Sequence, residues 1–250
     1  MATRFLKEVA PGTAETAYAA RRSKLVAPRL ADGYADRREE LATYFDHTAR
    51  QAWIDLTSDA EVSGVRATVR AGRDAMRALL LDWLPRDLRR TRVLDAGCGT
   101  GALTVAAACR GAEITGIDVA GALVEVARER APSFTGHGRI FWKSGDMLDP
   151  ALGQFSHVAA MDSLIHYELD DLVDALTTLA SRTDISIVFT FAPYTRVLGA
   201  MHKVGKVFPK GNRSPAIVPI AERELARRLH EAIPGWQVMR TQRVSNGFYT

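Results

Sequence analysis

Apolar residues recur along the chain in two different patterns, and the helical pattern comes first. Over residues 34–56 they appear at steps of three and four, which predicts an amphipathic helix with an interruption near residues 46–48. A second helix is expected to start after the capping residues Thr57, Ser58 and Asp59 and to end at Pro85. We therefore predict a helical arm over residues 34–90.

After this arm, short apolar runs alternate with amphipathic stretches. The runs predict strands at 92–96, 113–117, 139–143, 157–161 and 185–191. The intervening stretches predict helices at 102–110, 122–130 and 170–181. A helix over 222–232 and a closing pair of strands at 236–240 and 246–249 complete the pattern. Alternation of this kind is typical of a mostly parallel, doubly wound α/β sheet with helices on both faces.

Two segments fall outside both patterns. Residues 1–33 show no clear period and are predicted to be a loosely ordered tail. Residues 193–219 form an insertion whose apolar residues could share one helical face, with Lys203, Lys206, Lys210 and Arg213 beside or beyond them. The insertion is either an amphipathic substrate flap or a core helix with a solvated basic rim.

Composition limits the class of protein. Of the 250 residues, 47% are hydrophobic and 25% charged, which is an ordinary globular balance for one or two domains. The longest stretch of low polarity, residues 101–109, is much shorter than the roughly 18 residues of a membrane-spanning helix. The first residues lack the apolar region of a secretory signal, so we expect a cytoplasmic protein.

Charge and cysteine content exclude further classes. The net charge of +4 is mildly basic, which suits acidic small molecules or an anionic membrane surface. Nucleic-acid-binding proteins concentrate basic charge more strongly. The two cysteines, Cys98 and Cys109, have no metal-ligand spacing, and no group of histidines suggests a metal site. No protein-bound metal is expected.

The sequence VLDAGCGTG at residues 93–101 carries the strongest chemical signal. A buried strand ends in Asp95 and is followed by glycines at 97, 99 and 101, which lead into a helix. Glycine permits backbone angles that other residues resist and lets a ligand approach the main chain closely. Ligands of such sheets bind beyond the carboxyl ends of the strands. The spacing also fits the dinucleotide fingerprint of NAD-binding proteins.

Three carboxylates help to distinguish NAD from other nucleotides as the ligand of this motif. Asp95 precedes the first glycine, where it would repel a pyrophosphate but could balance an amino group. Asp118 ends the next strand and could bind the hydroxyl groups of a ribose, which NAD would also require. Asp146 follows the third strand and could accept a hydrogen bond from an adenine amino group. Amino acid, ribose and adenine together describe S-adenosylmethionine.

The motif resembles that of class I S-adenosylmethionine-dependent methyltransferases, and the resemblance covers residues 90–250. It implies a Rossmann-like sheet of seven strands over residues 91–250. It also implies cofactor contacts from residues that follow the strands: Asp95, Gly97, Cys98, Gly99, Gly101, Asp118, Val119, Asp146, Met147 and Asp162. Amino-group methyltransferases of nucleic acids have prolines after the fourth strand, whereas residues 162–167 read DSLIHY. Nucleic-acid substrates are therefore not expected.

Several blocks are similar to the magnesium-protoporphyrin IX methyltransferases of (bacterio)chlorophyll synthesis. These are YFDHT at 44–48, VRAGR at 69–73, the glycine motif, DSLIHY at 162–167, FAP at 191–193 and GFY at 247–249. The resemblance implies methyl transfer to one propionate carboxylate of magnesium protoporphyrin IX, with magnesium carried by the substrate. It also makes a magnesium chelatase subunit a plausible partner, and the basic flap could contact the inner or photosynthetic membrane.

The same resemblance points to catalytic roles for His166 and Tyr44. His166 would orient the propionate and Tyr44 would close over the site; a helix-capping histidine and a core tyrosine are the alternatives. Substrate propionates could be bound by basic residues of the second helix and the flap: Arg70, Arg73, Lys203 and Lys206. Three rival functions remain: a methyltransferase for another small acid, a non-catalytic tetrapyrrole-binding protein and an NAD enzyme.

Overall fold

Seven strands form one sheet in the computed structural model, which describes residues 1–7, 32–57, 64–194 and 215–245. The strands are β1 (Ala2–Lys7), β2 (Arg92–Ala96), β3 (Glu113–Asp118), β4 (Arg139–Ser144), β5 (Phe155–Ala160), β6 (Thr183–Thr190) and β9 (Trp236–Gln242). Their order across the sheet is β4-β3-β2-β5-β6-β1-β9. From β4 to β6 all neighbours are parallel, whereas β1 is antiparallel to both β6 and β9.

The predicted doubly wound α/β sheet is confirmed. Each of the five predicted parallel strands is present, with ends shifted by no more than two residues. The central strands are mostly apolar because both faces of the sheet are covered. Val93, Leu94 and Val158, for example, are fully buried.

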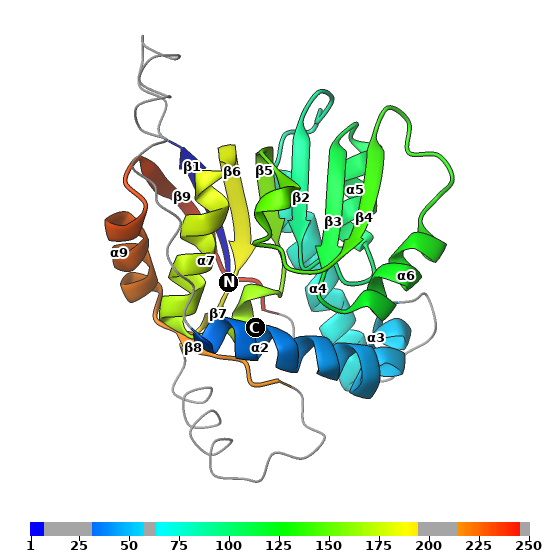
Figure 1. Ribbon diagram of the computed structural model, residues 1–250, viewed down its shortest axis with the longest axis horizontal. Coiled ribbons are helices and arrows are strands. Elements are labelled where there is room, and N and C mark those ends of the chain that lie inside the picture. Colours follow the sequence, from blue (N-terminus) through cyan, green and yellow to red (C-terminus); the bar gives the residue numbers. More distant parts are fainter. Residues whose placement is uncertain (8–31, 58–63, 195–214, 246–250) are drawn as a thin grey trace.

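Helices cover both faces of the sheet (Figure 1). On one face α4 (Gly64–Trp83) and α5 (Ala102–Cys109) share an apolar cluster with β2 and β3. On the other face α7 (Leu169–Ser181) and α9 (Glu222–Ala232) pack in the larger cluster. The helix α6 (Gly121–Arg130) packs against β3 and β4. Because α4 belongs to the same core as β2, the boundary at residues 90 and 91 stays a proposal.

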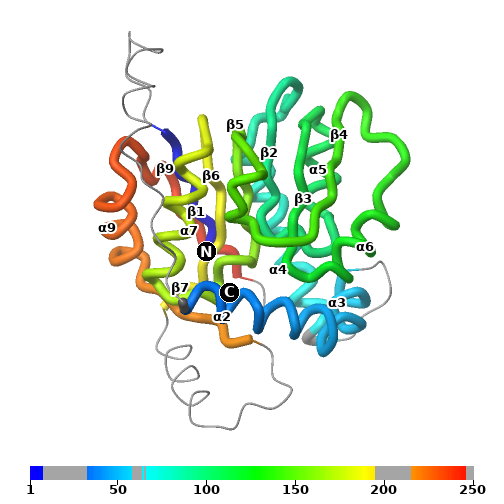
Figure 2. Tube along the Cα trace, in the orientation of Figure 1, coloured from blue at the N-terminus to red at the C-terminus, as the bar shows by residue number. Residues whose placement is uncertain are grey.

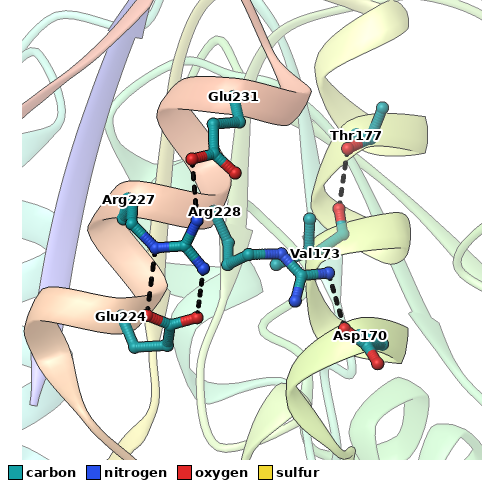
Figure 3. A network of polar contacts seen from close by, with 7 residues as sticks. All are labelled: Asp170, Val173, Thr177, Glu224, Arg227, Arg228 and Glu231. Carbon is teal, nitrogen blue, oxygen red and sulfur yellow. Dashed lines mark hydrogen bonds and ion pairs between the residues drawn. The ribbon is translucent and has the colours of Figure 1, made fainter.

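A surface network joins the two helices of the second face (Figure 3). Arg228 of α9 pairs with Asp170 of α7 at 2.5 Å, and Arg227 pairs with Glu224 and Glu231 within α9. The partner Asp170 is 77% exposed, so this pair adds little stability. Burial of Leu172, Leu225 and their neighbours therefore holds these helices in place.

The prediction of a loosely ordered tail over residues 1–33 is wrong for the first residues. Strand β1 lies between β6 and β9, as the tube in Figure 2 shows. Ala2, Thr3 and Phe5 are buried, and Phe5 stacks on Trp236 with ring centroids 5.4 Å apart. A run of six residues with two basic ones has no strand signature of its own. Its conformation is instead decided by two neighbours more than 170 residues away. Residues 8–31 lie outside the described part.

The C-terminal prediction is met in part. Strand β9 is present where 236–240 was predicted, while 246–249 lies outside the described residues. Most of the predicted flap, including Lys203, Lys206, Lys210 and Arg213, also lies outside them. Its two ends are joined by a short parallel pair, β7 (Ala192–Pro193) with β8 (Pro219–Ile220).

The helical arm crosses the edge of the sheet at which β2, β3, β5 and β6 end (Figure 1). This crossing part, the arm proper, comprises α2 (Asp32–Thr43), the single π-helical turn η1 (Tyr44–Thr48) and α3 (Arg50–Leu56). The helix α4, which was predicted as part of the same arm, packs in the sheet core instead. The interruption predicted near residues 46–48 is this π-helical turn, and such turns often mark functional sites. The arm thus covers the edge where the motif residues gather.

We predict that Phe5→Ala lowers the free energy of unfolding by about 3–5 kcal/mol, because it removes a ring buried in the sheet core. Phe134, which is 79% exposed, offers a matched control. Phe134→Ala should change the free energy of unfolding by no more than about 0.5 kcal/mol. Urea denaturation measures both. Equally small effects would show that the first residues are no part of the core.

Candidate functional site

The glycine turn after β2 is set by both conformation and space. Gly97 and Gly101 have φ angles of 85° and 82°, which side chains other than glycine rarely adopt. A Cβ atom on Gly97 would lie 2.3 Å from the Cβ atom of Ser163, and one on Gly101 would lie 2.5 Å from the ring of Trp142. The turn therefore presents bare main chain to the cavity beside it.

This cavity lies at the carboxyl ends of the strands and is closed from outside by the arm. Seven of the predicted cofactor residues line it: Gly97, Cys98, Gly99, Asp118, Val119, Met147 and Asp162. The arm contributes Tyr34, Leu41, Phe45 and Trp53. A second cavity, of about 290 Å³, shares Gly97 and Cys98 with the first and is lined by Asp95 and by Arg70, Arg73 and Arg77 of α4.

Asp95 is a buried carboxylate, and only one of its oxygens has a hydrogen-bond partner among the described residues. The side chain is 1% exposed, and its Oδ2 accepts a 2.5 Å hydrogen bond from the hydroxyl of Thr104. Its Oδ1 has no hydrogen-bond partner among the described residues. Burial raises the pKa of Asp95 to about 7. A ligand ammonium group in the second cavity would satisfy Oδ1 and stabilise the charged form.

Asp118 joins the end of β3 to the glycine turn. Its Oδ2 accepts from the amide of Gly99 at 2.8 Å, and its Oδ1 accepts from the amide of Ala120 at 2.9 Å. Burial raises the pKa of this carboxyl as well. Each oxygen keeps a lone pair that could accept from a ribose hydroxyl. The two carboxylates and the bare turn therefore fit an amino-acid nucleotide such as S-adenosylmethionine.

Asp146 follows β4, as predicted, but the side chain is already engaged by the arm. Its carboxylate accepts hydrogen bonds from Tyr34 and Arg38 of α2 and from the amide of Leu148. The neighbouring Gly145 and Met147 line the cavity. Asp146 itself is not among the residues that line this cavity, so its contact with an adenine ring stays a prediction.

Asp162 connects the end of β5 to helix α4. It has a φ angle of 57°, a strained conformation for a residue with a side chain. Its amide donates to Thr190 Oγ1 at 2.7 Å, and its carboxylate pairs with Arg73 at 2.7 Å. The Arg73 guanidinium also lies 4.6 Å from the ring of Trp53. Arg73 lines both cavities and is held against their common wall.

The structure separates the two predicted catalytic residues. His166 lies in the short helix η3 (Leu164–His166), is 7% exposed and lines the cavity. Its Nδ1 is 3.2 Å from the carbonyl oxygen of Ala216, and burial lowers the pKa of the ring. Tyr44 is not among the residues that line this cavity. Its ring packs edge-on against Phe45, which lines the cavity in its place.

The remaining predictions concern basic residues. Arg70 donates to the carbonyl oxygens of Asp55 and Leu56, so it caps the end of α3 while lining the second cavity. Sequence reasoning missed the other residues that line the main cavity: Tyr34, Leu41, Phe45, Trp53, Ile117, Leu123, Gly145, Met161, Ser163 and Tyr167. Residues 162–167 already held two of them, but nothing in the periodicity of the arm separates a cavity-lining aromatic residue from a core one.

The described residues hold neither a metal-binding cluster nor a membrane-spanning helix. No group of three or more histidine, cysteine, aspartate or glutamate side chains among them could hold a metal ion. Within the same residues no helix combines the length and apolar character needed to cross a membrane.

Comparison with known proteins connects this geometry to a family. A family model described as magnesium-protoporphyrin IX methyltransferase C-terminus matches residues 160–250, and a methyltransferase domain model matches residues 93–183. The magnesium-protoporphyrin O-methyltransferase of Rhodobacter capsulatus is 47% identical over 217 residues, which are 86% of this chain and 94% of that protein. Its counterpart in Synechocystis is 28% identical over 86% of this chain and 93% of that protein.

A solved structure agrees with both. Magnesium protoporphyrin IX methyltransferase from Synechocystis, crystallised with bound SAH (S-adenosylhomocysteine), superposes with a TM-score of 0.70 and 27% identity. The match covers 84% of this chain and 94% of the crystallised one. The identity to the Rhodobacter protein extends across most of this chain and nearly all of that protein, and the glycine turn is intact. The chain therefore belongs to the magnesium-protoporphyrin IX methyltransferase family.

Proposed function

We propose that this protein transfers a methyl group from S-adenosylmethionine to one propionate carboxylate of magnesium protoporphyrin IX. The products are the monomethyl ester and S-adenosylhomocysteine. Beyond family membership, one observation carries the proposal: Asp95 lines a cavity beside the glycine turn, and one of its carboxylate oxygens is buried without a partner among the described residues. Such an oxygen fits the ammonium group of an amino-acid nucleotide and would repel a pyrophosphate.

Each end of the cofactor has a group of this chain to hold it. Asp95 would bind the ammonium group, Asp118 the ribose hydroxyls and Asp146 the adenine amino group. Bound in this way, S-adenosylmethionine supplies an electrophilic methyl group. The glycine turn would let the cofactor approach the main chain, and the aromatic residues of the arm would keep water from the reacting atoms.

The acceptor needs alignment more than activation. A propionic acid side chain has a pKa near that of glutamate, about 4.3, so it is anionic in water at neutral pH. In the apolar cavity its pKa rises, and part of the acid retains its proton. If Nδ1 of His166 donates to Ala216, the neutral ring leaves Nε2 as an acceptor for that proton. His166 would thus orient the carboxyl group and, where the acid is still protonated, accept its proton.

The predicted basic residues differ in whether they are free to bind a carboxylate of the substrate or cofactor. Arg73 lines both cavities and could bind a carboxylate of substrate or cofactor in exchange for Asp162. Arg70 is already committed to the end of α3. Lys203 and Lys206 of the flap stay a proposal for the second propionate. Tyr44 stays a proposal as well, because it is not among the residues that line the main cavity.

Location and partners extend the proposal. A porphyrin partitions into membranes, so a peripheral contact with the inner or photosynthetic membrane would shorten its path to the site. The insertion at 193–219 supplies lysines suited to an anionic surface. A magnesium chelatase subunit in the cytoplasm would deliver the substrate directly.

The central test incubates the protein with magnesium protoporphyrin IX and isotope-labelled S-adenosylmethionine. We expect a porphyrin product that is heavier by one labelled methyl group, detected by mass spectrometry. Porphyrin binding without an ester would indicate a carrier. Esterification of other small acids, with the porphyrin left unchanged, would indicate a methyltransferase of another specificity.

We expect His166→Ala to lower kcat by about a hundredfold, the lower range for loss of a general base. Affinity for S-adenosylhomocysteine should change less than twofold, because the predicted cofactor contacts remain. His166→Gln keeps a hydrogen-bonding group and should recover part of the rate. Steady-state kinetics and calorimetry measure these quantities. An unchanged kcat in His166→Ala would remove the histidine from the mechanism.

We expect the affinity for S-adenosylhomocysteine to fall about tenfold from pH 8 to pH 6. Protonation of Asp95, whose pKa is about 7, removes the charge that attracts the ammonium group. Asp95→Asn should bind weakly at pH 8 and lose most of this dependence. Calorimetry at the two pH values is the measurement, and a flat profile in the unaltered protein contradicts the assignment.

Asp95→Asn should also be more stable than the unaltered protein at pH 8 when no ligand is bound. The folded pKa of Asp95, about 7, lies above the ordinary value of 3.8 for an aspartate. The contribution of Asp95 to the free energy of unfolding is therefore fully present below about pH 4 and is lost as the pH rises through 7. A higher Tm for the variant at pH 8, with little difference at pH 4, is the expected result of thermal unfolding.

A further inference from the structure

Asp146 is held by two side chains that come from a distant part of the chain. The hydroxyl of Tyr34 donates to Oδ1 at 2.8 Å, and Nη1 of Arg38 donates to Oδ2 at 2.7 Å. A third donor, the amide of Leu148, reaches Oδ1 at 2.8 Å from the same loop. Donors on both oxygens fix the plane of the carboxylate. The bond from Arg38 occupies one lone pair of Oδ2, and the other lone pair could accept from a ligand.

Tyr34 is part of the cavity wall as well as a hydrogen-bond donor. It is 2% exposed, and its ring stacks on that of Tyr167 with centroids 4.9 Å apart and an interplanar angle of 19°. Both rings line the cofactor cavity. Burial raises the pKa of the Tyr34 phenol, so the hydroxyl keeps its proton and donates it to the carboxylate. Tyr34 is thus a buried donor in the cavity wall, and it donates to the carboxylate that we assign to the adenine amino group. The contact therefore does more than attach α2 to the rest of the protein.

The arm makes a second attachment to the same edge of the sheet. In η1 the carboxylate of Asp46 accepts a 2.8 Å hydrogen bond from the amide of Ala122, in the first turn of α6. This amide lies four residues after Asp118. The arm is therefore fastened to the loops after β3 and β4, which carry the two carboxylates assigned to ribose and adenine. Figure 1 shows α2 lying across this edge.

We propose that Tyr34 and Arg38 are positioning residues for adenine recognition. They fix the orientation of the Asp146 carboxylate, so that it accepts a hydrogen bond from the amino group of the adenine ring. The arm thereby sets both the affinity for the nucleotide and the preference for adenine over a ring that carries a carbonyl oxygen in place of the amino group. This inference rests on the proposed function, since it takes S-adenosylmethionine as the ligand.

The test uses two probes, S-adenosylhomocysteine and S-inosylhomocysteine, in which a carbonyl oxygen replaces the adenine amino group. Calorimetry gives the affinity of each probe for the full chain and for two variants, Tyr34→Phe and Arg38→Met. Phenylalanine keeps the stacked ring and loses only the donor. Arg37→Met is the matched control, because Arg37 lies on the same helix and pairs with Glu40 instead.

We expect each variant to bind S-adenosylhomocysteine about tenfold more weakly, the usual cost of a lost hydrogen bond to a charged group. Binding of S-inosylhomocysteine should change less than twofold, so the preference for adenine falls. Arg38→Lys should restore part of it. Arg37→Met should leave both affinities as they were.

Three results would overturn the inference. Equal weakening of both probes would mean that the contacts support only the fold of the arm. Unchanged affinities would mean that Asp146 needs no help from α2. Tighter binding of S-adenosylhomocysteine by Tyr34→Phe would mean that the tyrosine competes with the ring. A protein that in its unaltered form binds neither probe would instead refute the proposed function.

Discussion

The hydrogen bonds between the glycine turn and the end of β3 organise the rest of the site. The amides of Gly97 and Cys98 both donate to the carbonyl oxygen of Ile117, and the amide of Gly99 donates to Asp118. These bonds bring the turn after one strand against the end of the next. Gly97 also leaves room for Ser163, which follows β5. A side chain at position 97 would collide with Ser163 and displace either the turn or the segment after β5.

The site concentrates features that are unfavourable for folding alone. Asp95 is a buried carboxylate with one oxygen that has no partner among the described residues. Asp118 is a second, partly buried acid, and Asp162 adopts a strained backbone conformation. A well-packed apolar core surrounds them, so the fold tolerates these local costs. Each feature becomes favourable once a cationic, hydroxyl-bearing ligand is bound. The stability of the empty site is thus lower than it could be, and binding energy recovers the difference.

The arm serves the cofactor end of the reaction as well as the substrate end. Its aromatic residues close the cavity, its first helix holds Asp146, and its π-helical turn holds the start of α6. Arg73 adds a fourth connection, from α4 to the strained Asp162. Because these contacts converge on loops that also touch the ligand, closure of the arm and nucleotide binding are expected to be linked in free energy.

Local sequence determined the sheet and the position of its ligands. The parallel strands, the glycine turn, Asp95 and Asp118 could be predicted because each depends on residues within a few positions: a buried apolar run, a glycine, an acid at a strand end. Parallel strands have their carboxyl ends at the same edge of the sheet, so the strand pattern alone predicts that Asp95 and Asp118 lie close together. The break in the first helix was predictable for the same reason.

Tertiary structure alone decided the rest. The first strand forms because β6 and β9 provide its hydrogen bonds, and six residues of mixed polarity could not show this. Only packing across the sheet edge turned Phe45 rather than Tyr44 toward the cavity, committed Arg70 to the end of α3, and brought Tyr34 and Arg38 to Asp146. These contacts join residues far apart in the chain, and periodicity records only which face of an element is apolar, never what that face will meet.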